Sequence, residues 1–287
     1  MYVSKTISAT SSMLALVAGQ ATPIWETLPP TPSLPGNAAG SHTQINGVEI
    51  WHAEFGTPSA EKLPVLMLHG GFGNSDYFGD VIEILMKNHY VIAMDTRGHG
   101  RSTMDSVPST YELYASDASG LLESLGISKA AWVGWSDMAM GTYAALMDAQ
   151  NSTLIDRAFA FGGGHEVAST NASFTSTAIY TEFVTRAQEE YQTLQPNGNL
   201  TAFANAVSTL EGTQPNWTES DFAKIRLGSK VTVSDAQYEE AIVLSEPALL
   251  NSWIEGSVLV TMTNVSHFAP VQDPVQFAAK VEAFLTE

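Results

Sequence analysis

The sequence predicts an α/β fold, in which a mostly parallel central sheet is flanked by helices and carries a helical insertion after the sixth strand. Short apolar runs alternate with segments whose apolar residues recur at helical spacing. The runs are apolar throughout, which is typical of strands buried on both faces of a parallel sheet. The alternation stops near residue 168 and resumes near residue 229, and the stretch between them is predicted to be helical.

The first predicted element is a β-hairpin. In TQINGVEIWHAEFG (43–56), Asn46-Gly47 separates two alternating segments, and this dipeptide favours a tight hairpin turn. The later predicted strands are residues 63–71, 89–95, 129–135, 157–163, 230–234 and 257–263. The predicted helices are residues 77–87, 111–126, 137–148, 179–194, 200–212, 240–253 and 273–285.

These elements divide the chain into four segments. Residues 42–167 and 229–287 are expected to form one core, with residues 168–228 as a helical lid over the carboxyl edge of the sheet. Residues 22–41, rich in Pro, Gly, Ser and Thr, are expected to form an extended arm. Residues 1–21 combine a lysine, a short apolar stretch and small residues, as a secretory signal peptide does, although a frayed arm is the alternative.

The composition excludes several classes of function. A formal charge of −18 repels phosphate backbones and anionic lipid headgroups, so we expect no nucleic-acid or membrane partner. The absence of cysteine removes disulfides, thiolate metal sites and cysteine nucleophiles. The histidines show no metal-binding spacing, and we expect neither a metal nor another cofactor. No apolar run is long enough to span a membrane.

Sequons support the export that the first residues suggest. Five asparagines begin N-x-S/T without an intervening proline, and we expect them to be glycosylation sites of a secreted protein: Asn151, Asn171, Asn199, Asn216 and Asn264.

Residues that can perform acyl transfer follow the predicted strands. Ser136 follows strand 129–135, an acidic cluster follows strand 230–234, and His267 follows strand 257–263. The carboxyl ends of parallel strands lie at one edge of a sheet, so these groups can meet there. His267 would take the proton from the Ser136 hydroxyl as general base, and a carboxylate would orient and stabilise the imidazole.

The glycines at residues 70 and 71 suggest where an oxyanion would be held. The main-chain N–H groups of Gly71 and Asp137 are the expected oxyanion donors. Gly70 and Phe72 in the same loop, together with Asp137 and Met138 after the serine, are expected to contact a small acyl substrate.

Four motifs in this order resemble a known family. They are HGGFGNS (69–75), DTRGHGRS (95–102), VGWSD (133–137) and NVSHFAPVQDP (264–274). Together they resemble the lid-bearing esterase, haloperoxidase and C–C hydrolase group of the α/β-hydrolase superfamily, over residues 43–285. The resemblance implies a Ser-acid-His triad, no cofactor and a nucleophile elbow at Ser136. The elbow is also similar to that of valacyclovir-hydrolase-like members, which implies that Asp137 can receive a substrate amine.

Two residues could complete the triad. When EEAI (239–242) is matched to the family's usual Asp-Glu-Ala-Ile, Glu239 falls on the acid position. Asp235, which is closer to the end of the strand, is the alternative acid.

Met138 departs from the family pattern. The usual elbow is G-x-S-x-G, and Met138 stands where the last glycine is expected. Its side chain would have to fold into a gap, since overpacking or a displaced oxyanion donor would impair the site. Two hypotheses therefore remain: a serine hydrolase acting on small esters, lactones or similar acyl compounds, and a hydrolase-fold protein whose site Met138 obstructs, which binds a ligand without turnover. The sequence does not indicate an oligomeric state.

Overall fold

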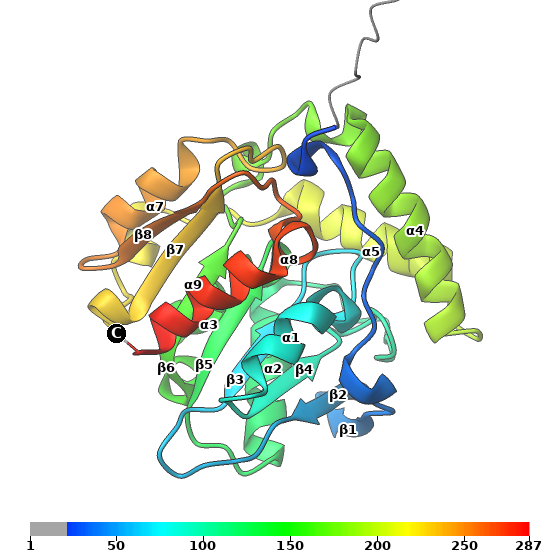
Figure 1. The fold of residues 1–287 in the computed structure, drawn as a ribbon, viewed down its shortest axis with the longest axis horizontal. Helices are drawn as coiled ribbons and strands as arrows, with labels where there is room; N and C mark the ends of the chain where they lie inside the picture. The colour runs from blue at the N-terminus through cyan, green and yellow to red at the C-terminus, as the bar shows by residue number, and fades with distance from the viewer. Residues whose placement is uncertain (1–21, 287) are drawn as a thin grey trace, which may run out of the picture.

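The computed structural model describes residues 22–286, and a twisted sheet of eight strands lies at the centre of this part of the chain (Figure 1). The spatial order is β1-β2-β4-β3-β5-β6-β7-β8. The β1–β2 and β2–β4 pairs are antiparallel, and the remaining neighbours are parallel. The strands are β1 (Ser41–Ile45), β2 (Val48–Phe55), β3 (Val65–Leu68), β4 (Val91–Met94), β5 (Ala130–Trp135), β6 (Ile155–Phe161), β7 (Val231–Ala236) and β8 (Val258–Met262).

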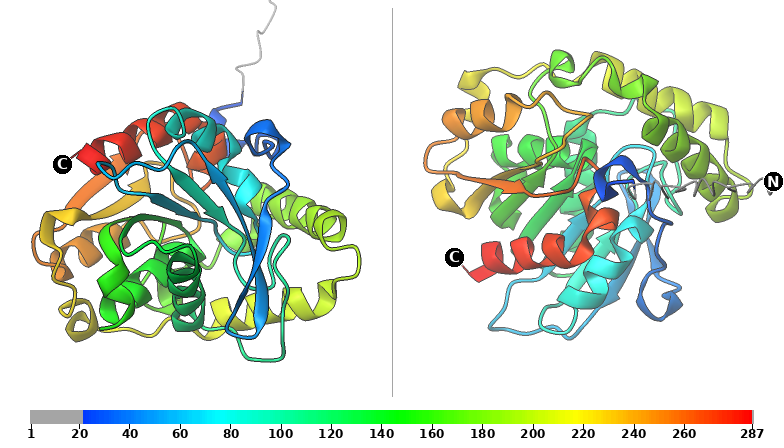
Figure 2. Two further views of the ribbon diagram at one scale, coloured as in Figure 1. Left: turned by 90° about the horizontal axis from the view of Figure 1, so that it is seen from below. Right: turned by 45° about the horizontal axis from the view of Figure 1, so that its top comes forward.

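Helices cover both faces of the sheet. The helix pair α1 and α9 packs on one face, and the pair α2 and α3 packs on the other (Figures 1 and 2). Successive residues of a strand enter the two cores in turn: in β3, Val65 faces the first pair and Leu66 the second. This explains why the strands are apolar throughout. The bounds are α1 (Gly79–Leu85), α2 (Tyr111–Ser124), α3 (Asp137–Met147) and α9 (Pro274–Thr286).

The segment between β6 and β7 contains three helices, α4 (Ala178–Leu194), α5 (Leu200–Thr213) and α6 (Glu219–Phe222). Figure 2 shows α4 and α5 outside the two helical layers that cover the sheet. We call residues 168–228 the insertion. Two shorter helices, α7 (Glu246–Trp253) and α8 (Ala269–Gln272), flank β8. Short 3-10 helices are formed by Ile24–Glu26, Pro35–Asn37, Ser75–Phe78, Asn151–Leu154, Val167–Ser169, Phe174–Ser176 and Gly228–Lys230.

The predicted arm, residues 22–41, is packed against the molecule and ends where β1 begins. Leu28 and Leu34 are buried in the core that contains α1 and α9. Arg186 of α4 donates hydrogen bonds to the carbonyl oxygens of Leu28 and Pro29. The arm thus joins the insertion to the core.

Most of the predicted elements are confirmed. The turn of the β1–β2 hairpin has positive φ at Asn46 and Gly47, as predicted. The helix predicted over 240–253 is wrong at its start, since α7 begins only at Glu246. The main-chain N–H groups of Ala241 and Ile242 instead donate to the Glu239 carboxylate, which holds this segment as a turn.

The predicted signal peptide, residues 1–21, lies outside the described residues. Among residues 22–286, no helix combines the length and the apolar character needed to cross a bilayer.

Candidate active site

The turn between β5 and α3 has a backbone that points one side chain out of the sheet. Ser136, at this turn, has φ 56° and ψ −119°, a conformation that L-residues rarely adopt. Its N–H donates to the carbonyl oxygen of Phe161, and α3 begins at the next residue. Strain of this kind persists only where the surroundings hold it in place. The turn therefore presents the Ser136 hydroxyl beyond the carboxyl end of β5.

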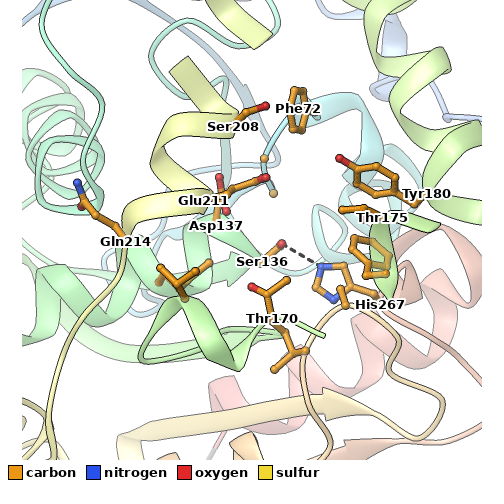
Figure 3. A pocket seen from close by; sticks show the side chains of 18 of the residues that line it. Phe72, Ser136, Asp137, Thr170, Thr175, Tyr180, Ser208, Glu211, Gln214 and His267 are labelled. Atoms are coloured by element: carbon orange, nitrogen blue, oxygen red, sulfur yellow. Dashed lines mark hydrogen bonds between the residues drawn. The ribbon is translucent and has the colours of Figure 1, made fainter. Parts of the chain in front are cut away.

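His267 lies beside this hydroxyl. Its Nε2 is 2.9 Å from the Ser136 Oγ, and its Nδ1 is 2.9 Å from Oε1 of Glu239 (Figure 3 shows the first contact). The main chain of His267 is held on both sides: its carbonyl oxygen accepts from the Trp135 indole, and its N–H donates to the Glu240 carboxylate. A hydroxyl, an imidazole and a carboxylate that are far apart in the sequence thus lie in contact in this order.

The two candidate acids occupy different positions. Glu239 lies at the imidazole, and its Oε1 also accepts from the main-chain N–H groups of Ala241 (2.7 Å) and Ile242 (3.0 Å). Asp235 lies at the end of β7, where its Oδ1 accepts from the N–H of Ala236. Burial raises the pKa of Asp235 well above its usual value, and the neighbouring Glu239 raises it further. The carboxyl group of Asp235 therefore favours its protonated, neutral form beside Glu239.

Burial also sets the protonation of the imidazole and its partner. Burial lowers the pKa of His267 below 6.5, while Glu240, Asp235 and Asp137 oppose this shift. Burial raises the pKa of Glu239 to about 7, against the hydrogen bonds that it accepts. The imidazole is consequently neutral at neutral pH, which is the form that a general base requires.

Ser136 lines a cavity of about 550 Å³ that lies between the core and the insertion. Four aromatic residues of the lining are Phe174, Tyr180, Phe183 and Phe268, and the rings of Phe174 and Phe268 lie beside that of His267. The lining also has a polar side. In Figure 3, Asp137 and Glu211 lie on the polar side, away from His267. None of the described residues that line the cavity is a lysine or an arginine.

The residues expected to contact the substrate or its oxyanion lie around Ser136, with the exception of Met138. Gly70, Gly71, Phe72 and Asp137 all line the cavity around Ser136. Asp137 is the first residue of α3, so its main-chain N–H has no partner within the helix and is free to serve an oxyanion. The structure does not bring Met138 into the lining of the cavity.

The Met138 side chain packs inside the helical layer. Met138 is 1% exposed and belongs to the core that contains α2 and α3. A Cβ atom added to Gly141 would lie 2.7 Å from the Met138 Cε, so the methionine occupies space that the glycine leaves free. The glycine of the same helix thus accommodates the methionine.

We expect Met138→Gly to cost stability without activating the site. Loss of the buried side chain costs about 2–5 kcal/mol, and glycine in a helix costs about 1 kcal/mol more. Urea unfolding measures this loss, with Met138→Leu as the control that keeps most of the volume. A rise in esterase activity in Met138→Gly would show instead that the methionine obstructs the site.

The insertion contributes residues to the cavity that sequence reasoning missed. Ser208 and Glu211 come from α5, and Gln214 follows it. The amphipathic pattern of α5 predicts a helix, but it does not indicate which polar residues at the edge of its buried face enter a cavity. Among the aromatic residues of the insertion, Tyr180 and Phe183 line the cavity, whereas Tyr191 and Phe203 stack on each other.

Within residues 22–286, no group of three or more His, Asp or Glu side chains is placed to hold a metal ion.

Comparison with known proteins identifies the family. Residues 64–152 match the family model described as the alpha/beta hydrolase fold, which includes the glycine loop and Ser136. The comparisons support the α/β-hydrolase superfamily over this region of the chain. The predicted fold class is confirmed, because solved structures share the fold of this chain. An enol-lactonase from Burkholderia xenovorans LB400 superposes with a TM-score of 0.69 and 19% identity, over 86% of this chain and 100% of the other.

Curated relatives match a limited region of this chain. A bifunctional esterase/perhydrolase from Acinetobacter calcoaceticus is 33% identical over 99 residues, or 34% of this chain and 35% of the relative. A non-heme chloroperoxidase from Streptomyces lividans is 33% identical over 98 residues, with 34% and 35% covered. The match spans about a third of the length of these relatives. The site of this chain itself is therefore the evidence for its activity.

Proposed function

We propose that this protein is a serine hydrolase that cleaves a small ester, lactone or similar acyl compound through an acyl-enzyme intermediate. The observation that carries the proposal is the contact of Ser136 Oγ with His267 Nε2 at 2.9 Å, with Glu239 at the opposite ring nitrogen. A neutral hydroxyl is a weak nucleophile, and an adjacent oriented base is what activates it.

The reaction proceeds in two halves. Ser136 Oγ attacks the carbonyl carbon while its proton passes to His267 Nε2, and the N–H groups of Gly71 and Asp137 stabilise the oxyanion. The imidazolium, stabilised by Glu239, then protonates the leaving alcohol, which departs and leaves an ester on Ser136. In the second half, His267 takes a proton from water, and the resulting hydroxide attacks the acyl carbon. The bond from this carbon to Ser136 Oγ then breaks, the carboxylic acid is released, and His267 returns the proton to Ser136 Oγ.

The cavity supports a small substrate with an apolar part. Its volume is in the range that encloses compact ligands, and aromatic side chains from both the core and the insertion line one side. The names of the similar proteins, which include an esterase and an enol-lactonase, agree with this class of substrate. Ligand binding without turnover would require Met138 to obstruct the site. No observation favours such an obstruction, since Met138 packs against Gly141 and does not line the cavity.

The proposal is tested by labelling the nucleophile. We expect a fluorophosphonate probe to attach covalently to Ser136, as located by mass spectrometry of the digested protein. We also expect p-nitrophenyl acetate to give a burst of nitrophenol equal to one acyl group per active site when deacylation is slow. A protein that is folded but neither labelled at Ser136 nor active on short esters would contradict the proposal.

The acid limb of the pH profile offers a further test. Because His267 must be neutral to act as base, kcat/KM is expected to rise as pH increases through its pKa. Burial lowers that pKa, so the midpoint of the rise is expected below pH 6.5. Initial rates with p-nitrophenyl acetate between pH 4.5 and 7.5 measure it, after correction for the ionisation of nitrophenol. A midpoint above 6.5 would contradict a buried, neutral imidazole.

We further propose that the protein is secreted and glycosylated. The support is the charged and apolar pattern of residues 1–21 and the five sequons, whose asparagines are all exposed or half-buried. Expression of the full chain in a eukaryotic host is expected to place it in the medium, and peptide N-glycosidase is expected to reduce its mass. Retention in the cell with no change in mass would contradict this proposal.

A further inference from the structure

Two carboxyl groups meet beside the nucleophile. Asp137 begins α3, and Glu211 comes from the last turn of α5 in the insertion. A Cβ atom added to Gly71 would lie 2.6 Å from Asp137 Oδ2 and 2.6 Å from Glu211 Oε1, so the two oxygens lie beside Gly71 and are no more than 5.2 Å apart. Figure 3 shows both carboxyl groups on the same side of Ser136.

The surroundings of this pair offer little to compensate two negative charges. Asp137 is 3% exposed, its Oδ1 accepts from the Tyr111 hydroxyl at 3.2 Å, and its Oδ2 has no hydrogen-bond partner among the described residues. The titratable groups that face the pair are Tyr111 and Tyr114 of α2, Tyr180 of α4 and His267. The tyrosines and the neutral imidazole carry no positive charge.

A buried carboxylate (Asp137) and a half-buried one (Glu211) without a cation beside them cannot both remain ionised at low cost, whereas a proton on one of them removes a charge. We propose that Glu211 is a positioning residue: with Asp137 it forms a carboxyl pair that holds one proton while the site is active, and loss of this proton loosens α5 and weakens the oxyanion hole. This inference rests on the proposed function for its catalytic half only.

The pKa values agree with the geometry. Burial raises the pKa of Asp137 to about 6, against the hydrogen bond that the carboxyl group accepts from Tyr111. Burial raises the pKa of Glu211 well above its usual value, and the charge of Asp137 adds to that shift. Each of the two carboxyl groups therefore keeps its proton to a higher pH than a free carboxyl group does.

The catalytic consequence follows from position. Asp137 supplies an oxyanion N–H through its main chain, and Gly71, the other expected donor, lies directly under the two carboxyl groups. A second negative charge there would oppose the charge that develops on the substrate oxygen, and through a partly screened interior it costs at least about tenfold in rate. The proton on the pair prevents this loss.

The first test measures the proton through stability and does not require activity. A carboxyl group whose pKa is raised on folding stabilises the protein below its unfolded pKa, and this stability is lost as pH rises through the folded pKa. We expect the Tm of the wild type to fall between pH 5 and 9. In Glu211→Gln the amide donates to Asp137 at every pH, so the fall is expected to be smaller by about 2 °C or more.

The matched control for this comparison is Glu189→Gln on the exposed side of α4, which should follow the wild type. If Glu211→Gln fails to fold, Asp137→Asn probes the same pair and should show the same smaller fall. Equal slopes of Tm against pH in the wild type and in the folded pair variants would overturn the proposal.

The second test uses the alkaline limb of kcat/KM on a neutral ester. The kcat/KM of the wild type is expected to fall by about tenfold or more at alkaline pH. The kcat/KM of Glu211→Gln, whatever its maximum value, is expected to fall less over the same range and to retain the acid limb set by His267. A merely structural role would lower both pH regions equally and would overturn the catalytic half. A protein inactive on all esters would refute the proposed function, while the dependence of Tm on pH would still decide whether the pair holds a proton.

Discussion

Ser136→Ala is expected to reduce kcat/KM on short esters by about 10⁴-fold or more. The hydroxyl is the group that forms the bond to the acyl carbon, and no other described nucleophile contacts His267 Nε2. The cavity, the oxyanion donors and the fold remain, so substrate binding should change little. The residual rate would come from those donors acting on bound water.

Ser208→Ala is the matched control for this variant. Ser208 is a second hydroxyl of the same cavity, carried by α5 and distant from the imidazole (Figure 3). We expect Ser208→Ala to change kcat/KM by less than about tenfold. Fluorophosphonate labelling should be lost in Ser136→Ala and retained in Ser208→Ala. Activity that survives in Ser136→Ala would refute the covalent mechanism.

Glu239→Gln is expected to lower kcat by about 10³–10⁴-fold. The amide keeps the length of the side chain, but it removes the charge that stabilises the imidazolium and can present an N–H to Nδ1, which favours the wrong tautomer. The main-chain donors of Ala241 and Ile242 can still bond to the amide oxygen, so the turn should remain folded. KM is expected to change little, because Glu239 does not line the cavity.

Asp235→Asn separates the two candidate acids. Asp235 does not occupy the position at Nδ1, and its raised pKa favours the neutral form that asparagine resembles. We expect a loss of less than about tenfold in kcat for this variant. A larger loss in Asp235→Asn than in Glu239→Gln, measured under the same conditions with both proteins folded, would assign the acid to Asp235.

Much of the fold could be predicted because its signals are local. Apolar runs such as VLML in β3 are required by burial on two faces, and Asn46-Gly47 specifies a turn within its own four residues. Ser136 and His267 could be placed because strand ends meet at one edge of a parallel sheet. Glu239 was reached by matching the residues after β7 to a family pattern.

The remaining features depend on packing between distant segments. The turn that delays α7 is held by the carboxylate of Glu239, although Pro247 near the start of α7 was a signal that could have corrected the boundary. Glu211 had no comparable signal, because its meeting with Asp137 depends on how α5 sits across the core. The room for Met138 likewise depends on Gly141 in three dimensions, not on the elbow motif alone.

The docked arm has a consequence for how the chain can be shortened. Gln272, in α8 after the His267 loop, donates to the carbonyl oxygen of Thr27, and Trp25 stacks on Tyr238, the residue before Glu239. The first described residues therefore brace both loops that deliver the imidazole and its carboxylate. A truncated version that starts at the β1–β2 hairpin would retain every strand of the sheet and yet lose the outer support of its proton relay.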